Sequence, residues 1–159
     1  IHFIPFLIGT GIDSSTAAFA TGAIGITQVV GRVIFAPLDR RYSSHAIAVV
    51  IFGLHIVAMI FLLLGQSALV IGIFIVVFGA AQGAGTLVRP SILADLYGAA
   101  HYGRISGVMV LFLTLTSTAA PLAASLIYDQ TGDYQGVLWM VLILAIAATG
   151  VMKFAGQRR

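Results

Sequence analysis

The chain has 159 residues, of which 60% are hydrophobic and only 8% are charged, and its formal net charge is +3. A water-soluble domain usually carries about 25% charged residues, so this composition excludes a single water-surrounded core and indicates a chain that lies in lipid. The absence of cysteine excludes disulfides and cysteine metal sites. No basic run with interleaved aromatic residues is present to follow a phosphate backbone, so we expect no nucleic-acid partner.

Apolar segments separated by short polar turns follow one another along the chain. We expect membrane spans over about 1–9, 17–38, 46–64, 68–96, 105–127 and 136–155. The first is too short to cross a bilayer, and it begins inside an apolar run with neither Met nor the basic start of a signal peptide. The prediction is an all-α membrane protein with five complete transmembrane helices and a truncated first one, cut from a longer protein.

The span at 17–38 carries the strongest signal. Its 22 residues contain one charge, Arg32. At about 1.5 Å per residue this helix is about 33 Å long, enough to cross a hydrocarbon core of about 30 Å. The doubly basic turn that follows, Asp39-Arg40-Arg41, is typical of a cytoplasmic end.

The basic residues all fall on one side of the predicted topology. The turns at 10–15, 65–67 and 128–135 hold three aspartates and neither lysine nor arginine. The turns on the other side and the C-terminal tail hold six of the eight basic residues, and Arg32 and Arg89 lie in the halves of their spans nearest that side. The positive-inside rule therefore predicts a cytoplasmic C-terminus in a plasma or inner membrane.

Arg32 is the best candidate for a functional residue in a span. A buried charge is costly there and usually faces the bundle interior or a wet cavity. We interpret Arg32 as an anion-binding or gating residue, with Gln28 one turn earlier on the same face. The alternative is that its long side chain reaches the cytoplasmic headgroups and has no role in binding.

The span at 68–96 combines small residues with one amide. Gly79 and Gly83 form a G-x-x-x-G pattern, which predicts close packing against another helix. Gln82, near mid-membrane, needs a partner on another helix or a ligand. For His55, in the span at 46–64, a proton relay and a neutral packed side chain are both open, and we favour the packed one.

Charged residues also gather at the predicted cytoplasmic ends of the spans. Arg89 and Asp95 lie on the same side as the turn that contains Asp39, Arg40 and Arg41. Such a cluster could form contacts in one state of a transporter and break them in another. The alternative is a solvated cluster worth about 0–1 kcal/mol per exposed pair.

Three stretches carry a family resemblance: the turn from Gly31-Arg32 to Asp39-Arg40-Arg41, the segment from Arg89-Pro90 to Tyr97-Gly98, and the outer turn from Leu126 to Tyr134. Together they resemble the C-terminal half of a major facilitator superfamily transporter, and the outer turn is similar to that of monocarboxylate-type and related organic-anion carriers. Tyr42 stands where the family usually has glycine. The resemblance implies one six-helix half built from 3+3 inverted repeats, with the N-terminal helical half missing.

The same resemblance implies that the helices at 17–38 and 68–96 line a central cavity. The expected function is secondary active transport of a small solute by alternating access. The solute class that the resemblance suggests is an organic anion such as a monocarboxylate. The candidate substrate-binding residues are Arg32, Gln28, Gln82 and Thr86, and the candidate gating residues are Asp39, Arg40, Arg41, Arg89 and Asp95.

Other function classes remain to be weighed against transport. A non-transporting membrane scaffold and an exporter of drug-like compounds are the alternatives. An intramembrane enzyme is disfavoured because no paired carboxylates, H-E-x-x-H spacing or Ser/His dyad lies at facing depths in the spans. We expect no cofactor or metal, and the predicted partners are membrane lipid, a small-molecule substrate and the missing helical half.

Overall fold

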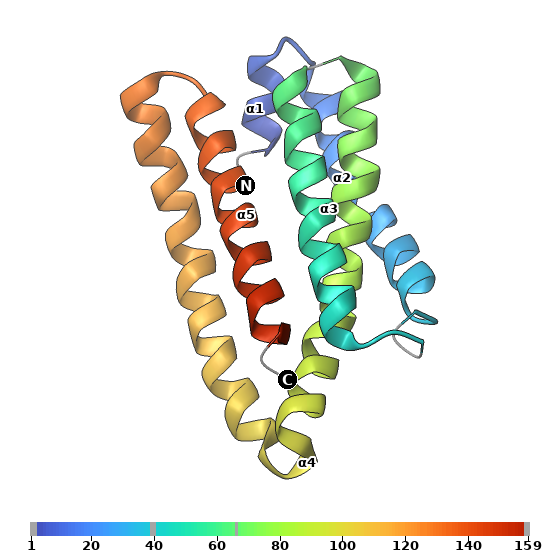
Figure 1. Cartoon of the computed structure of the whole chain (residues 1–159). Helices are drawn as coiled ribbons and strands as arrows, with labels where there is room; N and C mark the ends of the chain where they lie inside the picture. The colour runs from blue at the N-terminus through green and yellow to red at the C-terminus, as the bar shows by residue number, and fades with distance from the viewer. Residues whose placement is uncertain (1–2, 39–40, 66, 158–159) are drawn as a thin grey trace.

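The structure is a computed structural model that describes residues 3–38, 41–65 and 67–157, and these residues fold into a bundle of α-helices (Figure 1). The helices are α1 Phe3–Gly9, α2 Ser14–Phe35, α3 Ser44–Leu64, α4 Ala68–Thr131 and α5 Gln135–Gln157. Helix α4 is interrupted at Gly98, whose backbone is not helical (φ 67°, ψ 172°). We call Ala68–Gly98 its first arm and His101–Thr131 its second arm.

Among the described residues, five segments are long and apolar enough to cross a membrane: α2, α3, the two arms of α4, and α5. The predicted fold class, an all-α membrane protein with five complete spans and a short first helix, is therefore confirmed. Several bounds differ from expectation, because the turns predicted at 97–104 and 128–135 are shorter: α4 ends at Thr131 and α5 begins at Gln135. Helical structure continues to Gly98 on one side and resumes by His101 on the other.

Polar side chains set where the helices begin. The Asp13 carboxylate accepts hydrogen bonds from the backbone amides of Ser15 and Thr16, at 3.0 Å each, so α2 starts three residues before the predicted 17. Ser43 and Ser67 act in the same way at the starts of α3 and α4. These side chains satisfy amides that have no partner within the first helical turn.

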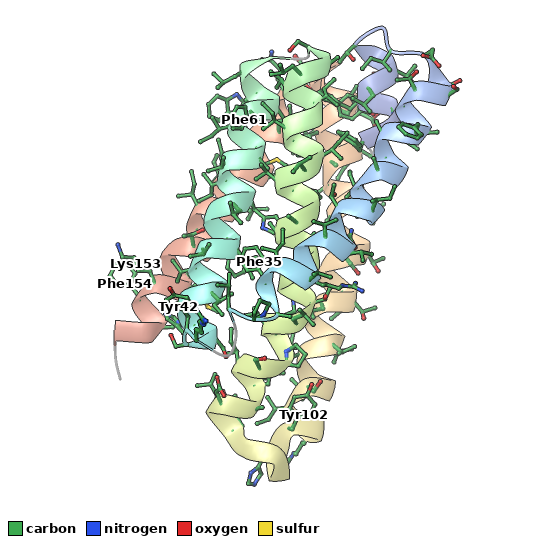
Figure 2. The ribbon with its side chains drawn as sticks, turned by 90° about the vertical axis from the view of Figure 1, so that its right-hand side faces the viewer. Phe35, Tyr42, Phe61, Tyr102, Lys153 and Phe154 are labelled. Carbon is green, nitrogen blue, oxygen red and sulfur yellow. The ribbon has the colours of Figure 1, made fainter. Side chains whose placement is uncertain are left out.

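The turns alternate between the two ends of the bundle (Figure 1). The turns that follow α1, α3 and α4 lie at one end, which we call the acidic end because it carries Asp13, Asp129 and Asp133. The α2–α3 turn and the Gly98 break lie at the opposite, basic end, which carries Arg41, Arg104 and Lys153. Figure 2 shows Tyr42, Tyr102 and Lys153 toward the basic end and Phe61 toward the acidic end.

Helix α3 and the first arm of α4 form the centre of the bundle. One buried cluster joins them to α1 and α2 and includes Phe6, Leu62 and Phe74, and a second includes Ile51 and Val88. Helix α2 and the second arm of α4 leave most of their side chains exposed. The bundle thus has two packed inner helices and two apolar outer faces.

Candidate functional site

Helix α2 meets the first arm of α4 with almost no side chain between the two backbones. A Cβ atom at Gly83 would collide with the backbone of Gln28, and one at Gly79 would collide with the Thr27 side chain. A Cβ atom at Gly31 of α2 would likewise collide with the backbone of Ala80. The predicted close packing of the G-x-x-x-G pattern is confirmed, because small residues let helices approach this closely.

A hydrogen bond between the two helices reinforces this contact. The Thr27 hydroxyl lies 3.0 Å from the Ile75 carbonyl oxygen of α4 and 2.9 Å from the Ile24 carbonyl oxygen of its own helix. It can donate to both through a shared, three-centre bond. In lipid, where water is absent, such a bond also satisfies a hydroxyl that would otherwise be costly to bury.

Two of the four predicted substrate-binding residues, Gln28 and Arg32, lie on α2 along this α2–α4 contact, and a third, Thr86, follows Gly83 on α4. Gln28 is half-buried against Gly83, and Arg32 follows it by one turn and is exposed. Thr86 lies one turn beyond Gly83, is exposed, and donates its hydroxyl to the Gly83 carbonyl oxygen at 2.7 Å. No hydrogen bond or ion pair joins the Arg32 side chain to another residue within the described part of the chain.

Gln82 faces the other way, into a cavity of about 440 Å³. The cavity lies between α3, the first arm of α4 and α5, and Met109 of the second arm also contributes. Its lining is mostly aliphatic and aromatic, and its polar side chains are Gln82, His55 and Arg89. Gln82 and Arg89 share a wall because residues seven apart in a helix lie on nearly the same face.

His55 is held on the wall of this cavity by contacts with two helices. Its Nδ1 atom lies 2.8 Å from the Ile51 carbonyl oxygen, and its Nε2 atom lies 3.3 Å from Gln82 Oε1. The Phe78 ring packs edge-on against the imidazole, with 5.3 Å between ring centroids. The half-buried ring is packed, as the sequence favoured, and it also lines the cavity.

The structure therefore separates the predicted substrate residues into two groups. Gln82 lines the cavity, whereas Gln28 and Arg32 belong to α2, which packs against another side of α4. Thr86 is bonded to its own helix and does not line the cavity. His55 is the polar cavity residue that the sequence did not select. A mid-span histidine was visible in the sequence, but its nearness to Gln82 depends on how α3 packs against α4.

The predicted gating residues lie toward the basic end. Asp95 Oδ2 accepts a hydrogen bond from the Ser44 hydroxyl at 2.7 Å, which ties α4 to the first turn of α3. A carboxylate there is also favoured by the positive end of the α3 dipole. Arg41 is exposed, and Arg89 lies in the large cavity rather than beside Asp95 in the smaller one. Asp39 and Arg40 fall outside the described residues.

The cavity can hold a ligand that has both an apolar body and a polar or anionic group. Its volume is within the usual range for small-molecule sites, and its few polar groups converge from α3 and α4. Arg89 supplies a fixed positive charge, and His55 and Gln82 supply hydrogen-bonding groups. Within residues 3–38, 41–65 and 67–157, no three His, Asp or Glu side chains gather closely enough to hold a metal ion.

Comparisons with known proteins agree with this architecture. The family model described as Major Facilitator Superfamily matches residues 3–158. Similar curated proteins include monocarboxylate transporter 12 from Xenopus laevis, 28% identical over 141 residues that cover 84% of this chain and 30% of that protein. The rat monocarboxylate transporter 12 is 25% identical over 162 residues, covering 98% of this chain and 33% of the relative.

A fungal relative extends the comparison beyond animals. An MFS-type transporter from Gibberella moniliformis is 24% identical over 148 residues, covering 92% of this chain and 34% of that protein. No solved structure matches the chain. The chain thus spans about a third of the length of these relatives. Because the family model covers nearly the whole chain and the described residues form five membrane-spanning helices, the chain belongs to the Major Facilitator Superfamily.

Proposed function

We propose that this chain forms the C-terminal half of a secondary transporter that moves a small organic anion, such as a monocarboxylate, by alternating access. The observation that carries the proposal is a cavity between the helices in a chain of this family, with Arg89 and two hydrogen-bonding side chains on otherwise apolar walls. An arginine in such a setting favours an anionic group, while the aliphatic lining favours a small apolar body. Relatives named as monocarboxylate transporters support the same class of solute.

The transport cycle would involve both faces of the first arm of α4. Arg32, Gln28 and Thr86 would meet the solute on the α2 side, and Gln82 would act from the cavity side. The Ser44–Asp95 hydrogen bond, together with Arg41, Arg89 and the neighbouring Asp39 and Arg40, would hold one state of the gate at the basic end. Alternating access needs such contacts to form in one state and break in the other.

The remainder of the transporter would complete the path. The exposed sides of α2 and of the second arm of α4 would face the N-terminal helical half or lipid. In this proposal α1 to α3 form one three-helix group, and the two arms of α4 with α5 form the second, inverted group. The basic end would face the cytoplasm of a plasma or inner membrane.

The experiment is uptake by the full-length protein in proteoliposomes. Labelled lactate, a neutral solute of similar size and an organic cation are supplied separately, and initial rates are measured against concentration. Saturable uptake of lactate that unlabelled monocarboxylates compete away is the expected result. Saturable uptake of only the neutral or cationic solute contradicts the anion assignment, and absence of uptake of a wide solute panel favours a membrane scaffold.

A further inference from the structure

A second cavity, of about 340 Å³, lies at the acidic end of the bundle. Residues of α1 and of the turn after it form one wall, and residues of the α4–α5 turn form the other. We call it the end pocket, and the side chains that define it are Phe6, Thr10, Tyr128, Asp133 and Tyr134. It shares no lining residue with the cavity proposed for the transported solute.

Three aromatic rings form one side of the end pocket. The rings of Tyr128 and Tyr134 stack with 4.4 Å between centroids, and the Phe6 ring meets Tyr134 at a right angle with 6.0 Å between centroids. Stacking covers one face of the Tyr128 ring, yet 38% of this residue is exposed, so its other face is accessible. The face of an aromatic ring is the negative part of its quadrupole and attracts cations.

Asp133 adds a full negative charge beside these rings. Its Oδ1 atom accepts a hydrogen bond from the backbone amide of Gln135 at 3.0 Å, at the start of α5. Within the part of the chain that the structure describes, no hydrogen bond or ion pair engages Oδ2. The positive end of a helix is equivalent to about half an elementary charge, so the carboxylate exceeds it and leaves the site negative.

Further groups around the end pocket present acceptors or negative dipoles. The Thr10 hydroxyl donates its proton to the Leu7 carbonyl oxygen at 2.7 Å, which leaves its own lone pairs to accept. Helix α1 ends at Gly9 and α4 ends just before Gly132, and both glycines line the pocket. The carbonyl ends of helices are negative and favour cations. No lysine, arginine or histidine is among the described residues that line the pocket.

We propose that the end pocket binds an organic ammonium group, with its methyl groups against the tyrosine rings and Asp133 as the counter-ion. A positive charge surrounded by methyl groups matches aromatic faces beside a carboxylate, because such a cation has no hydrogen bonds to lose on leaving water. The same acceptors would repel a carboxylate solute, so the end pocket and the solute cavity select opposite charges.

The size and position of the end pocket fit a small cation. Ligand sites usually measure about 300–1,000 Å³, so this one takes a group of the size of choline rather than a larger molecule. It lies where α1 and α4 end, so a ligand reaches it without crossing the hydrocarbon core. The ammonium group can therefore come from a water-soluble amine or from the choline headgroup of a lipid.

The experiment measures the binding of choline itself. The full-length protein is placed in nanodiscs of digalactosyl lipid, which is uncharged and has no ammonium group, and saturation-transfer NMR follows a choline titration against empty nanodiscs. The neutral carbon isostere of choline, dimethylbutanol, is titrated in parallel. We expect saturable binding of choline and at least about fivefold weaker binding of the isostere, because the isostere has the same shape without the charge.

The aromatic contribution is tested at Tyr128. Removing one cation–ring contact with Tyr128→Leu should weaken choline binding by about five- to thirtyfold. Tyr128→Phe keeps the ring face and should stay within about twofold of the unsubstituted protein. Size-exclusion chromatography checks the fold of both variants.

The charge is tested separately at Asp133. Asp133→Asn keeps an oxygen that can accept the Gln135 amide but removes the negative charge, so choline should bind at least about fivefold more weakly. Asp129→Asn is the matched control, because Asp129 is exposed at the same end and does not line the pocket. It should change the affinity by less than about twofold. This pair decides the question if Tyr128→Leu does not fold.

A second set of nanodiscs identifies the source of the ammonium group. Half of the digalactosyl lipid is replaced by phosphatidylcholine, which leaves the net surface charge at zero. A lower apparent affinity for free choline then supports occupation by the lipid headgroup, whereas an unchanged affinity supports a water-soluble amine.

Other outcomes overturn the site. Absence of saturable choline binding in the digalactosyl nanodiscs, or equal binding of the neutral isostere, excludes an ammonium site. Unchanged choline affinity in both Tyr128→Leu and Asp133→Asn places the binding elsewhere and overturns the assignment. Failure of the protein to transport organic anions would not affect these readings, because the binding measurement needs no uptake.

Discussion

Arg32 and Arg89 both lie within membrane-spanning helices, but in different surroundings. Both side chains are exposed, but Arg89 lines the cavity, whereas Arg32 lies one turn beyond the Gln28–Gly83 contact on the opposite side of α4. In the complete transporter that exposed side would face the other half or lipid. A solute that reached Arg32 would therefore lie between the two halves.

Replacing Arg32 by alanine tests this assignment. Hydrogen bonds to charged groups are worth about 1.5–3 kcal/mol, so Arg32→Ala should lower kcat/KM for the transported anion by about 10- to 150-fold. Concentration-dependent uptake into proteoliposomes measures the loss. Arg104→Ala, an exposed arginine at the basic end, is the control and should leave uptake unchanged. Equal kcat/KM values for Arg32→Ala and the unsubstituted protein would mean that Arg32 only reaches the headgroups.

Asp13 adds a pH-dependent contribution at the acidic end. Hydrogen bonds from the Thr16 side chain, and then from the backbone amides of Thr16 and Ser15, lower the pKa of the Asp13 carboxyl below its ordinary value of 3.8. A carboxyl whose pKa is lower in the folded state stabilises the fold above its unfolded pKa, and this stabilisation is lost as the pH falls toward the folded pKa.

The corresponding prediction is a smaller acid sensitivity in Asp13→Ala. Between pH 6 and pH 3, the thermal midpoint of the full-length protein in detergent should fall less steeply for this variant than for the unsubstituted protein. Asp129→Ala, at the same end of the bundle, controls for the removal of one negative charge. Parallel pH curves for Asp13→Ala and the unsubstituted protein would exclude the cap as a source of acid sensitivity.

At the scale of elements, the α2–α4 contact is the tightest feature of the bundle. Gly79 and Gly83 allow the α4 backbone to lie against Thr27 and Gln28 of α2. A methyl group added at Gly83 would meet the backbone of Gln28, which, unlike a side chain, has no other rotamer to adopt. Because lipid is as apolar as leucine, helix association in a membrane depends on such close packing and on interhelical hydrogen bonds. The contact therefore fixes the register of α2, and with it the position of Arg32.

A methyl group at Gly83 should disturb this packing. Overpacking typically costs about 1–3 kcal/mol, so Gly83→Ala should lower the free energy of unfolding in mixed detergent by about this amount. Gly72→Ala is the matched control on the same arm of α4, where nothing lies within 4 Å of the new Cβ atom. It should be neutral or slightly stabilising, since alanine favours a helix over glycine. A neutral Gly83→Ala would contradict the observed approach of the helices.

The break at Gly98 should be equally sensitive, for a different reason. Its φ of 67° and ψ of 172° lie in a region that essentially only glycine occupies, so Gly98→Ala should cost of order 1–3 kcal/mol in the same unfolding measurement. The control is Gly103→Ala, where the new Cβ atom has open space and φ is not positive. Equal stabilities for the two variants would show that the turn between the arms adopts another conformation.

For the whole molecule, the separation of charges between the two ends determines how the bundle is expected to sit in a membrane. Asp13, Asp129 and Asp133 lie at one end, and Arg41, Arg104 and Lys153 lie at the other (Figure 1). Positive charge is retained on the cytoplasmic side during insertion, whereas acidic residues contribute little to orientation. The basic end, and with it the C-terminus, is therefore expected to face the cytoplasm.

Single cysteines can test this orientation, because the chain has none of its own. In the full-length protein, with any cysteines elsewhere replaced, a membrane-impermeant maleimide should label Asp129→Cys in intact cells. Lys153→Cys should react only after the cells are permeabilised. Both side chains are exposed, so accessibility within the protein does not limit the reaction. The reverse labelling pattern would invert the orientation.

The sequence by itself determined the spans and their order, because every segment that crosses lipid must satisfy its backbone internally and must be apolar over about 20 residues. It also determined the glycine contact, since a G-x-x-x-G pattern has a direct packing consequence. The positions of the charged residues along the sequence likewise predicted which end of each span carries positive charge. These properties are local, and each can be read from a stretch no longer than about one helix and its turn.

Only the tertiary structure decided which polar side chains meet. Gln82 lies next to Gly83 in sequence, yet one faces His55 and the other faces Gln28, because neighbouring helical residues point about 100° apart. His55 and Gln82 are 27 residues apart, and Ser44 and Asp95 are 51 apart. Such pairs depend on the rotation of each helix about its own axis. That rotation is set by the packing of whole faces against one another, and no single stretch of sequence specifies it.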